Sequence, residues 1–237
     1  MLKGSIAGRR RRAAAVCAAL AVLLEEGCAR LPRKPRSTAA GPLTPAQIAE
    51  LWVEPDDLAS RDLFHGPGGP KLAPPAGGRL QFLSKDTKGY SWGWDVKDAS
   101  GTEWSVKYGP EAHSEVVASR LVWAIGFHQP PTYFVERWEL SGGQEPGLKP
   151  PGRFRPDLPG RRRAGEWSWR KNPFVDTQPY RGLLVMMRIL NNWDLLDRNN
   201  ELYELDPPRD GVRRYYVVKD LGASLGRTTA FGRPLVG

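Results

Sequence analysis

The sequence of 237 residues predicts an α+β fold, and three features support this class. Short runs of β-branched and aromatic residues, separated by Gly-bearing turns, indicate strands and hairpins. Two apolar helical stretches follow them, and the second is succeeded by two more β-like runs. A hydrophobic content of 40% with nine Trp indicates a chain that can bury a sizeable core. The net charge of +9 favours an anionic partner such as a nucleotide, a phospholipid or a nucleic acid.

Residues 1–28 resemble an export signal. A basic run at Arg9–Arg12 precedes an apolar stretch at Ala13–Leu24, which is too short to span a membrane comfortably. Gly27 and Cys28 are similar to a bacterial lipoprotein cleavage site, in which the cysteine is lipidated, although the Leu usual before that site is missing. We therefore expect a lipid-anchored protein of the cell envelope, with simple secretion or a misassigned start codon as the alternatives.

Residues 29–78 are rich in Pro, Gly, Ala and Arg and are predicted to form a tether or a wrapping arm. One amphipathic patch at Thr44–Trp52 interrupts this composition. Thr44 is expected to cap a short helix there, because Pro45 would occupy the first helical position.

Residues 79–140 are predicted to form a β-rich unit with one helix. Three strands are expected within Arg79–Lys107, and the turn between the first two contains Gly89 and Gly93. Glycines in such a turn allow backbone N–H groups to approach a phosphate group closely. The third strand ends in Lys107, and a further strand is expected at Tyr133–Leu140.

The clearest helix is predicted at Pro110–Ile125, with Gly126 as its stop. Glu111 and Glu115 stand near its start, and Glu115 is the closer of the two to the apolar side. The side predicted to be buried carries Val117, Leu121, Val122 and Ile125.

Residues 141–179 form a basic insert rich in Pro, Gly and Arg. Arg161–Arg163 and the pair Trp167 and Trp169 could bind nucleic acid or an anionic lipid surface. A solvated basic loop is the simpler interpretation. Export makes nucleic acid an unexpected partner.

Residues 180–237 contain the most informative polar loop. An apolar helical run at Gly182–Leu190 leads into N-N-W-D-L-L-D-R-N-N, which holds Asp194 and, five positions later, Asn199. Two β-like runs follow at Glu201–Leu205 and Arg213–Val218, and the second leads to Asp220 just before a Leu-Gly pair. A loop of Asn and Asp that only caps helices and turns is the alternative interpretation.

The order of these features resembles the atypical protein-kinase-like superfamily, in particular its HipA-like, secretory-kinase-like and bacterial lipoprotein-type members. The matching parts are the Gly turn, Val-Lys, the helical Glu, D-x-x-x-x-N and D-L-G, over residues 79–226. The loop departs from the protein-kinase pattern because no His-Arg pair precedes Asp194. It departs also in having Leu196 where these kinases usually have Lys.

The resemblance implies a two-lobed fold with ATP and Mg²⁺ bound between the lobes. Residues 79–140 would form the small lobe, and residues 180–237 would form the start of a helical large lobe. That second segment is short for a large lobe, so the sequence looks truncated.

The resemblance also implies a role for each candidate residue. Asp194 would act as the catalytic base, with Asp197 as the alternative base, in a phosphotransferase that acts on an unknown protein or small molecule. A catalytically inactive pseudokinase-like protein and a structural envelope lipoprotein remain the other interpretations. The cofactor and metal ligands would be Lys107, Glu115, Gly89 and Gly93 for the nucleotide, and Asn199 and Asp220 for the metal.

Overall fold

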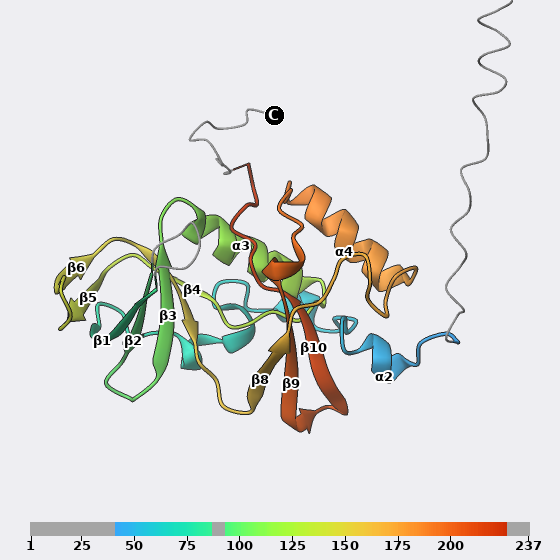
Figure 1. Cartoon of the computed structure of the whole chain (residues 1–237), viewed down its shortest axis with the longest axis horizontal. Helices are drawn as coiled ribbons and strands as arrows, with labels where there is room; N and C mark the ends of the chain where they lie inside the picture. Colours follow the sequence, from blue (N-terminus) through green and yellow to red (C-terminus); the bar gives the residue numbers. More distant parts are fainter. Residues whose placement is uncertain (1–40, 87–92, 227–237) are drawn as a thin grey trace, which may run out of the picture. The chain divides into compact units, whose positions relative to one another are not determined.

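Figure 1 shows the computed structural model, which describes residues 41–86 and 93–226. It has the predicted α+β composition, with a curled seven-stranded sheet, a three-stranded sheet and few helices. From Leu43 onward the chain clusters as one unit. The export signal with Cys28, residues 29–40 of the predicted tether, and Gly89 lie outside the described residues.

The larger sheet has the strand order β4-β7-β3-β2-β1-β5-β6. Its strands are β1 (Arg79–Asp86), β2 (Gly93–Lys97), β3 (Glu103–Tyr108), β4 (Tyr133–Val135), β5 (Trp138–Ser141), β6 (Gly147–Lys149) and β7 (Gly152–Pro156). The single strand predicted at Tyr133–Leu140 is therefore two strands, and they pair at opposite ends of the sheet. Because only a short link joins β4 to β5, the sheet must curl to bring its ends together.

Alternating side chains explain why these strands enclose a core. Trp94 and Val96 on β2 face the same side as Trp104 and Val106 on β3, since successive side chains of a strand point to opposite faces. Phe154 of β7 packs with them, and its ring meets that of Trp104 edge to face. The curled sheet therefore encloses an aromatic core of its own.

The predicted long helix is α3 (Glu111–Ala124). It ends before Gly126, whose φ of 99° favours glycine and whose added Cβ would lie 2.1 Å from the carbonyl oxygen of Val53. The side predicted to be buried was wrong in part, because Leu121 and Ile125 are exposed. The buried side instead carries small or polar residues, which allow α3 to pack closely against β7 and β4. These residues are Ala112, Ser114, Glu115, Val116, Ala118, Ser119 and Val122.

The described part of the predicted tether is packed on the protein. Thr44 caps α2 (Pro45–Ile48) through a capping box, as the sequence indicated. Leu51 is only 1% exposed, and the indole nitrogen of Trp52 donates to the carbonyl oxygen of Ile125 at 2.7 Å. Three short 3₁₀ helices follow: η1 (Leu58–Ser60), η2 (Gly66–Gly68) and η3 (Pro70–Leu72).

The smaller sheet has the order β10-β9-β8. It is formed by β8 (Arg161–Gly165), β9 (Asn200–Arg209) and β10 (Val212–Val218). The hairpin turn uses Asp210 and Gly211, whose φ angles of 51° and 79° suit a tight Asp-Gly turn. The second of the two apolar helices predicted from the sequence is α4 (Gln178–Ile189). Thr177 caps it, and the Thr177 hydroxyl accepts from the backbone N–H of Tyr180. The short helix η4 (Asp197–Asn199) precedes β9.

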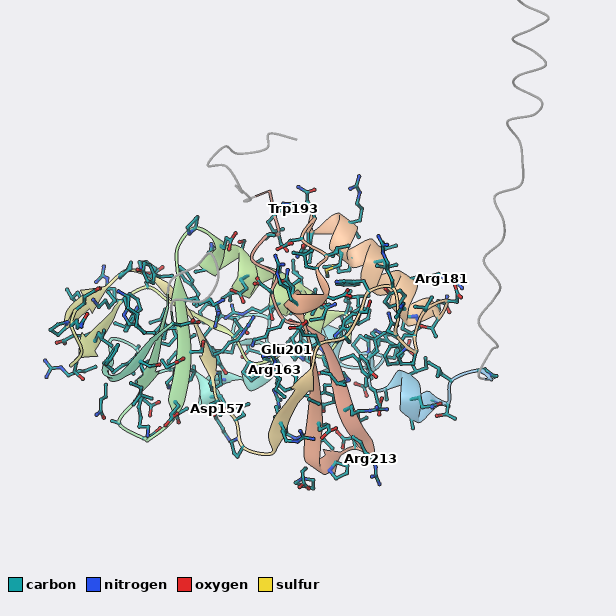
Figure 2. All side chains as sticks on the ribbon, in the orientation of Figure 1. Asp157, Arg163, Arg181, Trp193, Glu201 and Arg213 are labelled. Carbon is teal, nitrogen blue, oxygen red and sulfur yellow. The ribbon has the colours of Figure 1, made fainter. Side chains whose placement is uncertain are left out.

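The insert predicted as a solvated loop contributes strands and core residues. Trp167 and Trp169 are buried in a second hydrophobic core, together with Phe174. This core also takes the inner side of α4, whereas Ile189 on the outer side is exposed. In Figure 2 the side chains of Arg181 and Trp193 likewise point outward.

The position of Leu51 in the second core makes a testable prediction. Leu51→Ala should lower the free energy of unfolding by about 2 to 5 kcal/mol, since it removes buried methyl groups and leaves a cavity. Leu63→Ala is the matched control, because Leu63 is 44% exposed, and it should change stability by less than about 0.5 kcal/mol. Urea denaturation of the full chain measures both values. Equal, small effects would mean that Leu51 lies in a tether.

Candidate functional site

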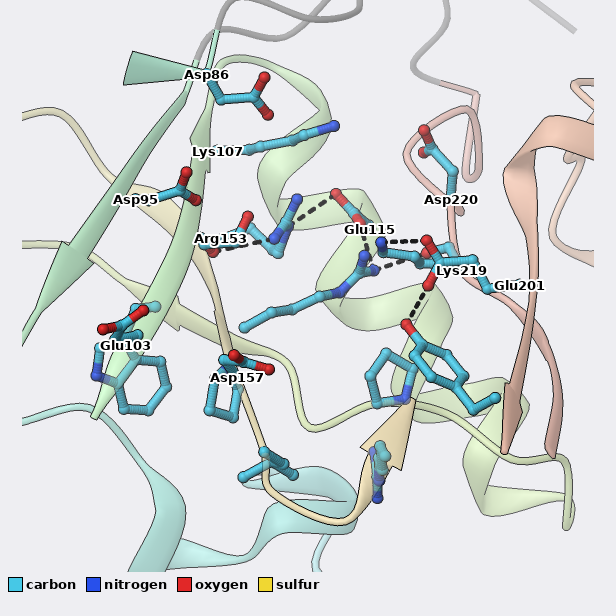
Figure 3. A pocket seen from close by; sticks show the side chains of 18 of the residues that line it. Asp86, Asp95, Glu103, Lys107, Glu115, Arg153, Asp157, Glu201, Lys219 and Asp220 are labelled. Carbon is cyan, nitrogen blue, oxygen red and sulfur yellow. Dashed lines mark hydrogen bonds and ion pairs between the residues drawn. The ribbon is translucent and has the colours of Figure 1, made fainter. Parts of the chain in front are cut away.

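A cavity of about 570 Å³ lies between the two sheets. One wall comes from β3, β7 and the buried side of α3, and the other comes from β8, η4, β9 and the segment after β10. Figure 3 shows Lys107, Glu115, Glu201, Lys219 and Asp220 gathered around it. The cavity is lined mainly by charged side chains, although Trp104, Pro130, Pro156 and Leu158 also contribute.

Four of the predicted site residues line this cavity. Lys107 lies on β3, Glu115 on α3, Asn199 at the end of η4, and Asp220 just after β10. Gly93 lies on β2 directly opposite Lys107, and a Cβ there would stand 2.4 Å from the carbonyl oxygen of Val106. The backbone of β3 therefore comes too close to position 93 for any residue other than glycine, independently of a role in nucleotide binding.

The back of the cavity contains a buried ion-pair cluster. Glu115 accepts from Arg155 Nη2 at 2.5 Å through Oε1, and from Arg153 Nε at 3.2 Å through Oε2. All three side chains are less than a tenth exposed. Among the described residues, Glu115 forms its ion pairs with these two arginines.

The electrostatics of this cluster keep Glu115 ionised. Burial alone would raise the pKa of the Glu115 carboxyl, but the charges of Arg153, Arg155 and Lys107 outweigh it and lower the pKa. The positive charge of Lys107 therefore stabilises the Glu115 carboxylate electrostatically, while the Lys107 ammonium group points into the cavity (Figure 3).

Arg153 and Arg155 were missed because they belong to the stretch predicted as a solvated basic insert. They lie on β7 at positions i and i+2, so both point to the same face, toward α3. Phe154 between them points to the aromatic core. The alternation in G-R-F-R-P is the sequence pattern that could have identified a strand with two inward arginines.

A second buried carboxylate lies on the opposite wall. Glu201 of β9 accepts from Lys219 Nζ at 2.5 Å and from the hydroxyl of Tyr203, and Arg163 Nε stands 3.3 Å away. Burial raises the pKa of Glu201, but Lys219, Tyr203 and Arg163 together lower it below its ordinary value. Glu201 therefore holds the Lys219 side chain at the cavity.

The backbones of Asn199 and Asp220 are adjacent. The backbone N–H groups of Lys219 and Asp220 both donate to the carbonyl oxygen of Asn199, at 2.9 and 3.1 Å. The side-chain amide of Asn199 donates to the backbone oxygen and to Oδ2 of Asp194, each at 3.0 Å. Asp194 is thus joined to the cavity through Asn199, although it does not line the cavity itself.

Asp197, the alternative base, serves a different part of the structure. Its Oδ1 accepts from the backbone N–H of Trp169 at 3.0 Å, and its side chain does not line the cavity. Asn192 braces the same loop, since its Oδ1 accepts from the N–H of Asp194 and its Nδ2 donates to Ser224. The loop therefore has the capping bonds that the alternative interpretation expected, in addition to its position beside the cavity.

Asn199 and Asp220 offer side-chain oxygen atoms of the kind that bind hard cations. The carboxylate of Asp220 and the amide oxygen of Asn199 are oxygen donors, which Mg²⁺ prefers. No group of three or more His, Cys, Asp or Glu suited to a metal occurs within residues 41–86 and 93–226. A Mg²⁺ ion held by one or two protein ligands together with phosphate oxygens does not need such a group.

Comparison with protein-family models, with curated proteins and with solved structures gave no match. In the part of the chain that the structure describes, no helix has the length and apolarity needed to cross a membrane.

The ionised state of Glu115 predicts a dependence of stability on pH. Glu115→Gln should lower the free energy of unfolding at pH 7 by about 3 to 5 kcal/mol, because two buried guanidinium groups lose their counter-charge. The pKa of Glu115 is lower in the folded protein, so its ionised form stabilises the fold above the ordinary value of 4.5. That contribution is lost as the pH falls through the folded pKa.

The stability difference between the parent and Glu115→Gln should therefore be largest at neutral pH and shrink in acid. Glu136→Gln, at an exposed position, is the control and should follow the parent throughout. Denaturant titrations from pH 7 to pH 3 measure the difference. A difference that stays constant over this range would contradict the assignment.

Proposed function

We propose that the chain is a kinase-like phosphotransferase that binds ATP and Mg²⁺ in the cavity between its two sheets. The observation that carries this proposal is the convergence of Lys107, Asn199 and Asp220 on one cavity from three separate stretches of sequence. Each of these residue types was expected there from the order of the motifs. The seven-stranded sheet with α3 would correspond to the small lobe, and α4 with the loop after it to the start of the large lobe.

The chemistry of phosphoryl transfer suits the residues at the cavity. It asks the protein mainly to neutralise phosphate charge and to orient the nucleophile. Lys107 would contact the phosphates as a cation, while Asn199 and Asp220 would hold Mg²⁺, which neutralises charge that develops on the phosphates. Asp194 would accept the proton of the acceptor hydroxyl, with its carboxylate held in place by the Asn199 amide.

A second candidate is a nucleotide-binding module without turnover. The specific observation in its favour is that Asp194 and Asp197 both lie off the cavity lining. The segment 1–28 supports a location in the cell envelope, with anchoring through a lipidated Cys28. The acceptor in the enzymatic case would then be a protein or a small molecule of that compartment.

Binding of the nucleotide is the first test of the proposal. Mg²⁺ with ATP at about a hundred times its dissociation constant should stabilise the full chain by about 2.7 kcal/mol, seen as a raised melting temperature. Asp220→Asn should lose the metal-dependent part of that shift. Asp210→Asn, in the exposed turn between β9 and β10, is the matched control and should keep the whole shift. A cooperatively folding parent with no shift would argue against both nucleotide-binding interpretations.

Turnover distinguishes the two candidates. In an enzyme, Asp194→Asn should lower the rate of ATP consumption by about a hundredfold or more, because general-base catalysis typically contributes that much. Nucleotide binding should persist in this variant. Asp197→Asn tests the alternative base and should retain the rate, since its carboxylate faces Trp169. Binding without measurable turnover in the parent would favour the module.

A further inference from the structure

We propose that Arg155 is a positioning residue that sets the place of Asp220 relative to Lys107. The inference deepens the proposed function and rests on it, since it concerns the metal ligand of the same cavity. The segment that carries Asp220 is Val218–Gly222, which lies at the end of β10 and after it, and which bonds to α3 through the Gly222 carbonyl.

Arg155 bonds directly to α3 and to this segment. Its Nη2 donates to Oε1 of Glu115 at 2.5 Å and to the carbonyl oxygen of Lys219 at 2.7 Å, and its Nε donates to Thr132 at 3.3 Å. The side chain is 7% exposed, so these bonds are shielded from water. One guanidinium group therefore links β7, α3 and the residue before Asp220.

Two other side chains hold the neighbouring carbonyl groups. Gln129 Nε2 donates to the carbonyl oxygen of Val218 at 3.2 Å, and Ser114 Oγ donates to that of Gly222 at 2.9 Å. Ser114 lies on α3 and Gln129 lies between α3 and β4, so neither residue is part of the seven-stranded sheet. Arg155 is the member of this group that lies on the seven-stranded sheet, because β7 pairs with β3.

The strand register connects Arg155 to Lys107. Arg155 pairs with Ser105 and Arg153 pairs with Lys107, so both arginines stand on the strand next to the phosphate-facing lysine. The bond from Arg155 to the Lys219 carbonyl consequently fixes the distance across the cavity between Lys107 and Asp220. A bound nucleotide would contact Lys107 through its phosphates and Asp220 through its metal ion. Both contacts can form together only if Lys107 and Asp220 are held at the right distance.

Arg153 offers a matched control within the same cluster. It shares Glu115 with Arg155, but its second bond goes to the carbonyl oxygen of Ser105 at 3.2 Å, inside the seven-stranded sheet. Arg155→Met and Arg153→Met each leave Glu115 with one guanidinium partner. Arg155→Met also loses the bonds to the Lys219 carbonyl and to Thr132. Arg153→Met instead loses the bond to the Ser105 carbonyl and the positive charge that acts on Asp220.

The binding experiment compares ATP affinity by calorimetry, with EDTA and with Mg²⁺, in the full-length parent and both variants. In Arg155→Met, the ATP affinity measured with EDTA should stay within about twofold of the parent value. The factor by which Mg²⁺ raises the ATP affinity should fall about tenfold, as expected for the loss of one hydrogen bond from a charged donor. Arg153→Met should keep that factor or increase it, because it removes a positive charge that acts on Asp220 but leaves the bond to the Lys219 carbonyl. An equal loss in both variants would overturn the positioning role.

Amide hydrogen exchange in the absence of any ligand supplies the second readout. The N–H groups of Lys219 and Asp220, which donate to Asn199, should exchange faster in Arg155→Met than in Arg153→Met. Equal rates would reject the role of Arg155 regardless of nucleotide. Faster exchange together with a parent that does not bind ATP would reject the proposed function and leave the positioning role intact.

Discussion

The structure depends most on the buried carboxylate of Glu115 between the guanidinium groups of Arg153 and Arg155. Removing three charges from water is costly, and the cost is offset only because they pair with one another and with backbone oxygens. The cluster fastens α3 to β7, and through Arg155 it reaches the end of β10. Glu115 therefore helps to place the two cavity walls, together with the bonds from Gln129 and Ser114 to the end of β10 and the segment after it.

The two hydrophobic cores lie on either side of this cluster and leave the space between them polar. The aromatic core is enclosed within the curled sheet, and the second core lies among α3, α4 and the smaller sheet. Glu115 and Glu201 each bind their cations on their own wall of the cavity. These two buried carboxylates are already paired with cations of their own walls. The side chains of Lys107 and Asp220 line the cavity.

The sequence predicted the elements whose conformation depends on residues that are close together in the chain. The hairpins, the cap at Thr44 and the stop at Gly126 follow from backbone preferences of a few neighbouring residues. The β9–β10 hairpin returns the chain, so that the backbone of Asp220 lies beside that of Asn199.

What the sequence did not predict depends on contacts between distant segments. Tyr133–Leu140 reads locally as one strand, and only the pairing with β7 and β1 divides it. Leu51 lies in the amphipathic patch of the predicted tether, and its burial depends on the surface that α3 and α4 present. The two arginines of β7 looked like solvated charges because their counter-ion, Glu115, lies 38 residues away from Arg153 in the sequence.

The most direct test of the account is hydrogen exchange of the full chain with and without ATP and Mg²⁺. The account predicts slower exchange together in β3, in η4 with the start of β9, and in Val218–Gly222, since a ligand in the cavity contacts all three. Protection confined to other segments, or no protection at saturating nucleotide, would contradict the assignment of this cavity as the nucleotide site.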